Sequence, residues 1–201
     1  MSQWTVSLVN KLYALFSRGS VEDLESFLYA NELEGLPDLC VGGYQQVYAF
    51  EKVVEGYSVP MYNWLVDHGL DPHCLAWHLP TNLYKAQKKI LNPDDKEAEV
   101  AKFRAFIDKL LDVGYPRFHE GTFVFMDILY DTLPEDIDLL KRLDEANSML
   151  SYSGVTCKAL PLIVKNERKQ TMSYLVQKGK TCRVLIQTMQ RSCCYLALQS
   201  K

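Results

Sequence analysis

The chain has 201 residues, with 22 basic and 25 acidic residues, a net charge of −3 and 48% hydrophobic residues. This hydrophobic share suffices for a buried core and excludes a disordered chain, and the length predicts one domain over residues 1–201. The lack of a sustained basic stretch excludes nucleic acid as a partner. No apolar run reaches the roughly 18 residues that a membrane-spanning helix needs.

The N-terminal segment and the cysteines predict a cytoplasmic location. Residues 1–6 carry no basic residue ahead of an apolar stretch, which is unlike a secretory signal. Six cysteines in 201 residues are too sparse for a disulfide scaffold. We therefore expect the cysteines to be reduced.

Amphipathic helices are predicted in pairs along the chain, and a short polar turn joins the two helices of each pair. The first helix has its apolar positions at Trp4, Leu8, Leu12 and Leu15. The turns lie at residues 17–20, 56–60, 132–135 and 165–168. In chain order, the further predicted helices cover residues 21–28, 47–54, 61–66, 106–113, 122–130, 136–143, 159–164 and 170–176.

The second helix of each pair ends in a recurring pattern. Gly69, Gly114 and Gly179 each follow apolar residues placed seven, four and three positions earlier. Such residues share one helix face, and a glycine that adopts a left-handed conformation closes the helix. Asn31 and Asn147 take the same place in two further copies, because asparagine is the next-best residue there.

These five ends are spaced by 38, 45, 33 and 32 residues, which predicts about five to six helix-turn-helix units. Leu65, Leu110 and Leu175 lie four positions before the three glycines, and we expect them to be buried. Residues 180–201 form the predicted C-terminal cap. The longer spacings indicate extra connecting segments at residues 32–43 and 70–98.

Three motifs resemble those of the ankyrin repeat. Residues 69–72 (Gly-Leu-Asp-Pro) look like the Gly-Ala-Asp turn of that family, and residues 17–24 look like its turn between helices. Residues 121–129 look like its Gly-Thr-Pro-Leu-His helix start, although the Thr-Pro-Leu-His tetrapeptide is nowhere intact. The resemblance implies an all-α, ankyrin-like solenoid. It also implies a non-catalytic module that binds another protein, with no cofactor and no small-molecule substrate.

The candidate partner-binding residues lie in the 70–98 insertion and in the hairpin that follows the third repeat end. Insertions and hairpin tips gather on the binding side of a solenoid, and aromatic and arginine side chains are common interface anchors. In the alternative interpretation, these aromatic side chains turn inward and pack on the core. The candidates are Trp77, His78 and Tyr84 in the insertion, and Tyr115, Arg117, Phe118 and His119 in the hairpin.

Residues for catalysis or metal binding lack a characteristic spacing. His68, His73, Cys74 and His78 lie within eleven residues but without the paired spacing of zinc sites, so we expect no metal. Two other functions stay open: an all-helical enzyme with a cysteine or histidine in a cleft, and a terminal fragment of a longer solenoid. The divergence of the repeats also suits a viral or bacterial factor acting on a host protein, which would place the chain in the host cytosol.

Overall fold

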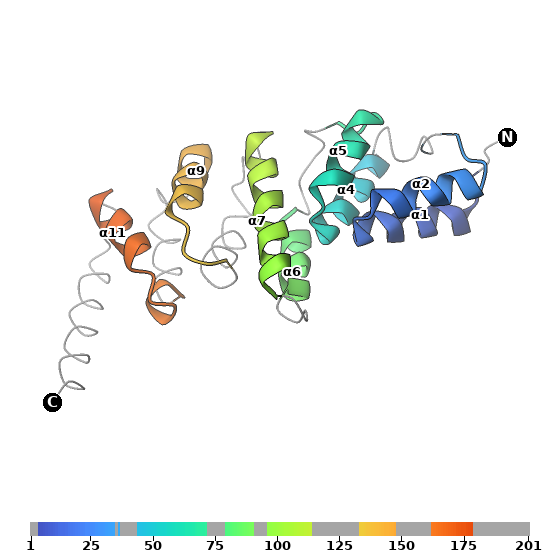
Figure 1. Ribbon diagram of the computed structural model, residues 1–201. Coiled ribbons are helices and arrows are strands. Elements are labelled where there is room, and N and C mark those ends of the chain that lie inside the picture. The colour runs from blue at the N-terminus through green and yellow to red at the C-terminus, as the bar shows by residue number, and fades with distance from the viewer. Residues whose placement is uncertain are drawn as a thin grey trace. The chain divides into compact units, whose positions relative to one another are not determined.

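The computed structural model describes residues 4–34, 36, 44–71, 79–90, 96–113, 133–147 and 162–178. All regular secondary structure in these ranges is helical, which confirms the all-α prediction (Figure 1). The chain divides into two compact units, Met1–Pro116 and Arg117–Lys201. The helices are α1 (Val6–Arg18), α2 (Val21–Ala30), α4 (Tyr44–Gly56), α5 (Val59–Asp67), α6 (Leu79–Ile90), α7 (Lys96–Asp112), α9 (Ile137–Asn147) and α11 (Lys169–Gln177).

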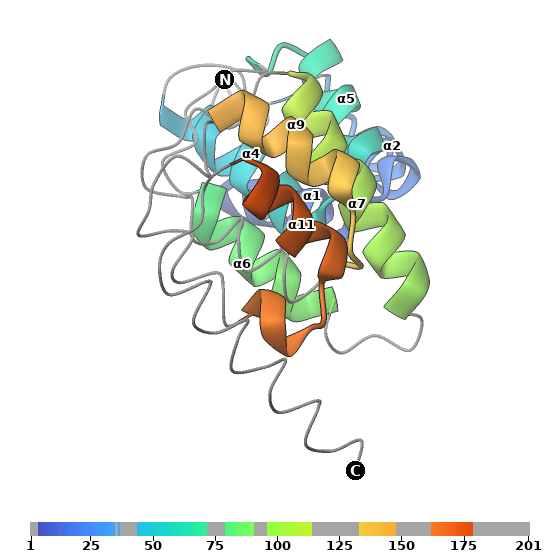
Figure 2. The ribbon, with the colours of Figure 1, turned by 90° about the vertical axis from the view of Figure 1, so that its left-hand side faces the viewer.

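The helices of Met1–Pro116 form consecutive pairs: α1 with α2, α4 with α5, and α6 with α7. The first helices of neighbouring pairs contact each other, α1 with α4 and α4 with α6, and so do the second helices, α2 with α5 and α5 with α7. We call α1, α4 and α6 the first-helix layer, and α2, α5 and α7 the second-helix layer. Figure 2 shows the second-helix layer on the right of the first-helix layer.

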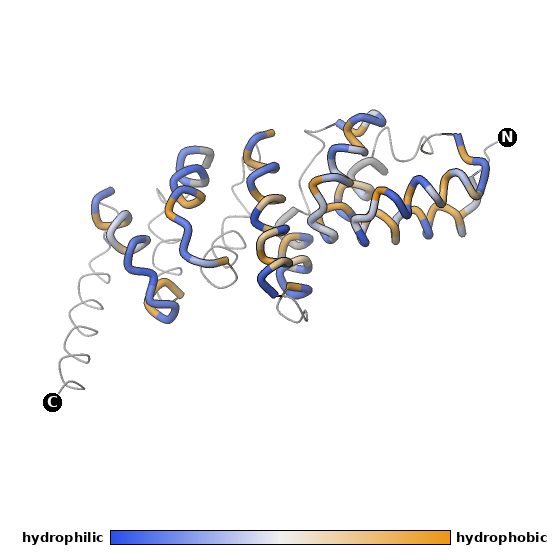
Figure 3. Tube along the Cα trace, in the orientation of Figure 1, coloured by the Kyte–Doolittle hydropathy of each residue, from blue (hydrophilic) through white to orange (hydrophobic). Residues whose placement is uncertain are grey.

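The core of this unit lies between the two layers and consists of large aromatic and aliphatic side chains. Hydrophobic and hydrophilic residues alternate along the helices (Figure 3), a pattern that gives a helix one apolar face. The Tyr62 ring of α5 stands edge-on to Phe50 of α4, at 6.1 Å between centroids, and to Phe106 of α7, at 6.4 Å. Leu65 and Leu110 are 0% and 1% exposed, which confirms their predicted burial.

The end of α5 has the predicted glycine closure. Gly69 has a φ of 96°, its N–H donates to the Val66 carbonyl, and the next N–H, of Leu70, donates to the Leu65 carbonyl at 2.9 Å. These two bonds are a Schellman motif, which satisfies carbonyl groups left over at a helix end. Gly114 and Gly179, for which the same role is predicted, lie outside the described residues.

The end of α2 has the same motif, but one residue later than predicted. The left-handed residue is Glu32, with a φ of 52°, whereas Asn31 has a φ of −106°. The Asn31 side chain instead donates a hydrogen bond of 2.7 Å to the Phe27 carbonyl, and the Leu33 N–H donates to the Leu28 carbonyl. The left-handed residue that closes α2 is therefore Glu32 and not Asn31. Asn147, the other predicted asparagine end, is the last residue of α9.

The 70–98 segment is not a plain insertion, because α6 lies inside it. This helix packs on α4 and on α7, so it is the first helix of a third pair. The prediction missed it because its buried face mixes the apolar Leu83 and Ile90 with the polar Asn82 and Gln87. The predicted 106–113 helix likewise extends back to Lys96 as α7.

Left-handed residues also mark the turns between the two helices of a pair. Gly19, Tyr57 and Glu167 have φ values of 78°, 40° and 52°, and each stands two residues before the first residue of α2, α5 or α11. The intervening residue is the N-cap. Ser20 and Ser58 accept a hydrogen bond from the backbone N–H three residues later, which stabilises the first turns of α2 and α5.

The first two of these turns contact each other directly. The Ser58 hydroxyl donates a hydrogen bond of 2.8 Å to the Gly19 carbonyl. A Cβ atom at Gly19 would lie 2.7 Å from that of Ser58, and one at Gly56 would lie 2.8 Å from the Ser17 carbonyl oxygen. The two helix pairs therefore approach at a distance that leaves no room for a side chain at Gly19 or Gly56.

In Arg117–Lys201, the described helices α9 and α11 pack against each other. Residues 162–165 add one helical turn ahead of α11. Leu175 is 0% exposed, as predicted. Arg168 offers no side-chain cap to α11, and the Glu135 carboxylate replaces it by accepting the Thr171 N–H at 2.8 Å. A carboxylate at a helix N-terminus also interacts favourably with the helix dipole.

The contact between the turns predicts that the two capping serines differ in their contribution to stability. Both Ser20→Ala and Ser58→Ala remove an N-cap, at a cost of about 1 kcal/mol each. Ser58→Ala also removes the bond to the Gly19 carbonyl, so we expect it to cost about 1 kcal/mol more than Ser20→Ala. Urea unfolding of both variants and the wild type measures the difference. Equal costs would show that the bond between the turns contributes nothing.

Candidate functional site

Most of the predicted partner-binding residues lie outside the part of the chain that the structure describes. Tyr84 belongs to α6, but its side chain is outside the described set. The binding role of all of them stays a prediction. The residues outside the described ranges are Trp77, His78, Tyr115, Arg117, Phe118 and His119.

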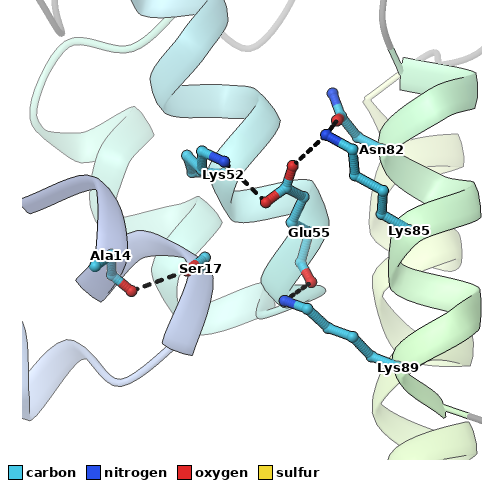
Figure 4. Close-up of polar contacts among 7 residues, drawn as sticks. All are labelled: Ala14, Ser17, Lys52, Glu55, Asn82, Lys85 and Lys89. Atoms are coloured by element: carbon cyan, nitrogen blue, oxygen red, sulfur yellow. Dashed lines mark hydrogen bonds and ion pairs between the residues drawn. The ribbon is translucent and has the colours of Figure 1, made fainter. Parts of the chain in front are cut away.

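The structure brings together a different group, a cluster of lysines around Glu55 at the end of α4 (Figure 4). Lys52, one turn earlier on α4, donates to one carboxylate oxygen of Glu55 at 3.0 Å. Lys85 of α6 donates to the other oxygen at 2.8 Å, and Lys89 of α6 donates to the Glu55 backbone carbonyl at 2.9 Å. We call these four residues the Glu55 cluster. It links two neighbouring helices of the first-helix layer.

Glu55 is charged in this setting although it is only 9% exposed. Burial alone raises the pKa of the carboxyl group, but the hydrogen bonds from Lys85 and Lys52 outweigh burial, and the pKa lies below its usual value. The hydrogen bond to Glu55 in turn raises the pKa of Lys85. Both groups are therefore ionised at neutral pH, and one carboxylate holds lysines from two helices in place.

An exposed tyrosine lies beside the Glu55 cluster. Tyr48 of α4 is 44% exposed, and its ring stands edge-on to Tyr13 of α1 at 4.6 Å. The Lys52 ammonium nitrogen lies 5.2 Å from the centre of the Tyr48 ring, within the range of a cation–π contact. Lys88 of α6 is exposed next to Lys89. This face of α4 and α6 thus presents a tyrosine and lysines together.

The two layers of Met1–Pro116 differ in charge. The first-helix layer has six basic and two acidic residues, a net charge of +4. The second-helix layer has four basic and eight acidic residues, a net charge of −4. Charges of one sign on one face create a potential that attracts ligands of the opposite sign.

The second-helix layer has its own aromatic surface, centred on Trp64 of α5. The Trp64 indole N–H donates to Glu25 of α2 at 3.2 Å, and the His68 ring stacks on Trp64 at 3.6 Å between centroids. Tyr29 of α2 is 88% exposed. These contacts join α2 to α5, and the His68 ring is engaged in stacking.

Tyr57 and Glu99 form a structural link from the end of α4 to the start of α7. The Tyr57 hydroxyl donates to the Glu99 carboxylate, and Lys102 pairs with the same carboxylate at 2.5 Å. Burial, followed by the bond to Glu99, raises the pKa of Tyr57. The hydrogen bond from Lys102, followed by that from Tyr57, lowers the pKa of Glu99. Both groups therefore stay in their ordinary ionisation states at neutral pH.

Among the described residues, no group of three histidine, cysteine, aspartate or glutamate side chains is placed to hold a metal ion. Of the four residues weighed for metal binding, His68 is described, whereas His73, Cys74 and His78 are not. All six cysteines, which are predicted to be reduced, also lie outside the described residues. None of the helices in the described ranges has both the length and the apolar character of a membrane span.

Comparison with models of known protein families, with characterised protein sequences and with solved structures finds no match to this chain.

The sequence interpretation missed the Glu55 cluster because it took Lys85, Lys88 and Lys89 as part of a connecting segment. The spacing of Lys52 and Glu55, three residues apart on a predicted helix, is the signal that could have found one half of it. The other half depends on the packing of α6 against α4, which joins residues 30 positions apart.

The lowered pKa of Glu55 predicts an acid-sensitive contribution to stability. The carboxylate stabilises the fold above the pKa of the unfolded chain, and this contribution is lost as the pH falls through the lower folded-state pKa. We expect Glu55→Gln to lower the melting temperature at pH 7, with a difference from the wild type that shrinks between about pH 5 and pH 3. Thermal unfolding monitored by circular dichroism across this range measures the difference.

A Lys85→Gln background is the control for this experiment. It removes the hydrogen bond from Lys85 that helps to hold the Glu55 pKa down, so the pH dependence of Glu55→Gln becomes weaker there. An effect of Glu55→Gln that is the same at pH 7 and pH 3 would contradict the assigned ionisation.

Proposed function

We propose that the chain is a non-catalytic protein-binding module whose helix pairs form an ankyrin-like stack. The packing of Met1–Pro116 supports this arrangement, because first helices pack on first helices and second helices on second helices. A unit that contacts mainly its sequence neighbours is typical of helical repeat proteins. The proposal requires neither a cofactor nor a catalytic group.

The spacing of the left-handed residues supports the repeat. Tyr57 and Gly69 flank α5 and lie 12 residues apart, and Gly19 and Glu32 flank α2 and lie 13 residues apart. In both cases the left-handed residue before the helix is followed by a serine N-cap. Two copies of one turn–helix–turn element therefore follow each other in the chain, separated by the first helix α4.

One observation carries the binding role: the face of α4 and α6 presents Tyr48 beside lysines that Glu55 holds in fixed positions. A tyrosine provides a large contact area at low cost in conformational entropy, and interfaces are enriched in it. Lysines that are already ordered lose less side-chain entropy when they bind a partner. This face therefore combines the properties of a preorganised interface.

Capture experiments with two tyrosine variants test the proposal. The tagged full chain is exposed to an extract of the cells in which it is expressed, and the bound proteins are quantified by mass spectrometry. We expect Tyr48→Ala to lose the proteins that the wild type enriches, because Tyr48 lies on the proposed interface. Tyr29→Ala should keep them, although Tyr29 is the more exposed tyrosine, because it lies on the second-helix layer.

Melting temperatures of both variants control for folding, since the Tyr48 ring also contacts Tyr13. Enrichment that Tyr48→Ala leaves unchanged would place the interface elsewhere. Failure of the folded wild-type chain to enrich any protein would contradict the binding role itself.

A further inference from the structure

We infer that the first-helix layer of Met1–Pro116 binds an acidic segment of the partner protein, with the lysines of the Glu55 cluster and Lys88 as the contacting cations. This inference rests on the proposed protein-binding function and specifies the chemistry of the partner. It starts from the unequal charges of the two layers, +4 for the first-helix layer and −4 for the second-helix layer.

The Glu55 cluster has donors to spare for a ligand. Each lysine ammonium group has three N–H donors. The contacts within the described part of the chain use two donors of Lys85, for Glu55 and Asn82, and one each of Lys52 and Lys89. Every one of the three ammonium groups therefore keeps at least one N–H for solvent or for an incoming carboxylate.

The cations outnumber the anions on this face. Helices α4 and α6 together have four lysines, and their acidic residues are Glu51 and Glu55. Among the described residues, Lys89 donates to a backbone carbonyl, a contact that does not neutralise its charge. Lys85 keeps 54% of its side chain exposed in spite of its ion pair. An incoming carboxylate meets an excess of positive charge that the fold has already ordered.

The size of the cationic face fits a short peptide segment. Lys85 and Lys89 are one helical turn apart, a rise of about 6 Å along α6, and Lys52 reaches the same carboxylate from α4. Side chains two residues apart on an extended peptide are separated by about 7 Å, so consecutive acidic side chains on one side of such a peptide match this spacing. Tyr48 lies beside the lysines and supplies an apolar contact for the flanking residues.

Nucleic acid and membrane surfaces fit this face less well. A nucleic-acid backbone needs a longer basic track, whereas here Glu51 and Glu55 interrupt the lysines and the second-helix layer is acidic. A helix that lies on a membrane places several large apolar side chains beside its lysines. Near the Glu55 cluster, the exposed large apolar side chain among the described residues is Tyr48.

Fluorescence anisotropy with labelled probes tests the inference on the full chain. The first probe is an acetylated peptide of alternating glutamate and serine. The others are the same peptide with glutamine for glutamate, an oligothymidylate and vesicles that contain phosphatidylserine. We expect the wild type to bind the glutamate peptide at least about tenfold more tightly than the other three probes, with an affinity that falls as salt rises.

Lys88→Gln/Lys89→Gln is the test variant, because it leaves both ion pairs of Glu55 intact. It also removes the Lys89 hydrogen bond to the Glu55 carbonyl, so the melting temperature of this variant is measured beside its affinity, and the affinity of the folded variant is compared. We expect it to weaken binding of the glutamate peptide by about tenfold. The matched control, Lys96→Gln/Lys102→Gln, removes the same charge from α7 of the second-helix layer and should leave the affinity unchanged within about twofold. Equal losses in the two variants, or no binding of the glutamate peptide, would overturn the inference.

Tighter binding of the oligothymidylate or of the vesicles than of the glutamate peptide would also overturn the inference, because the ligand class would be wrong. Competition in the capture experiment separates this inference from the proposed function. If an excess of the glutamate peptide releases the captured proteins, both stand. If proteins are captured and the peptide does not release them, the protein-binding function is supported and the inference of an acidic partner segment is contradicted.

Discussion

The close approach of neighbouring chain segments at residues 55–57 is the constraint on which the packing of Met1–Pro116 depends. These three consecutive residues each contact a different helix. Gly56 lies against the backbone at the end of α1, where an added Cβ atom would be 2.8 Å from the Ser17 carbonyl oxygen and 3.0 Å from that of Phe16. Glu55 binds the lysines of α6, and Tyr57 binds Glu99 and packs on Phe103 of α7. The end of α4 is thus held from three sides.

The functional proposals follow from this arrangement. Because the end of α4 is held against α6, the charge of Glu55 orders Lys52 and Lys85 at the surface. The same junction separates the layers, since the turn at Tyr57 directs the chain from the first-helix layer into the second. Charge segregation between the layers and the preorganised lysines are therefore consequences of the fold, and they set the chemistry of a partner that the face of α4 and α6 can accept.

The sequence predicted the helices where apolar residues recur with the period of a helix and where a glycine or serine marks the boundary. Gly69 and the burial of Leu65, Leu110 and Leu175 are confirmed on this basis. The prediction failed where polar residues are buried, as in α6. Its buried face includes the polar Asn82 and Gln87, so apolar residues alone do not mark this face. The Glu55 cluster was out of reach for a further reason: it joins α4 to α6, and local spacing carries no information on which helices become neighbours.

The free energy of unfolding of Gly56→Ala tests the central role of the 55–57 junction most directly. Alanine has a higher helix propensity than glycine, by about 1 kcal/mol in a helix interior, so without tertiary contacts this substitution at the last residue of α4 would be stabilising. At Gly56 the new Cβ atom meets backbone carbonyl oxygens of α1, which cannot move aside as a flexible side chain can. The account predicts that Gly56→Ala destabilises the chain in urea unfolding. A stabilised Gly56→Ala variant would contradict it.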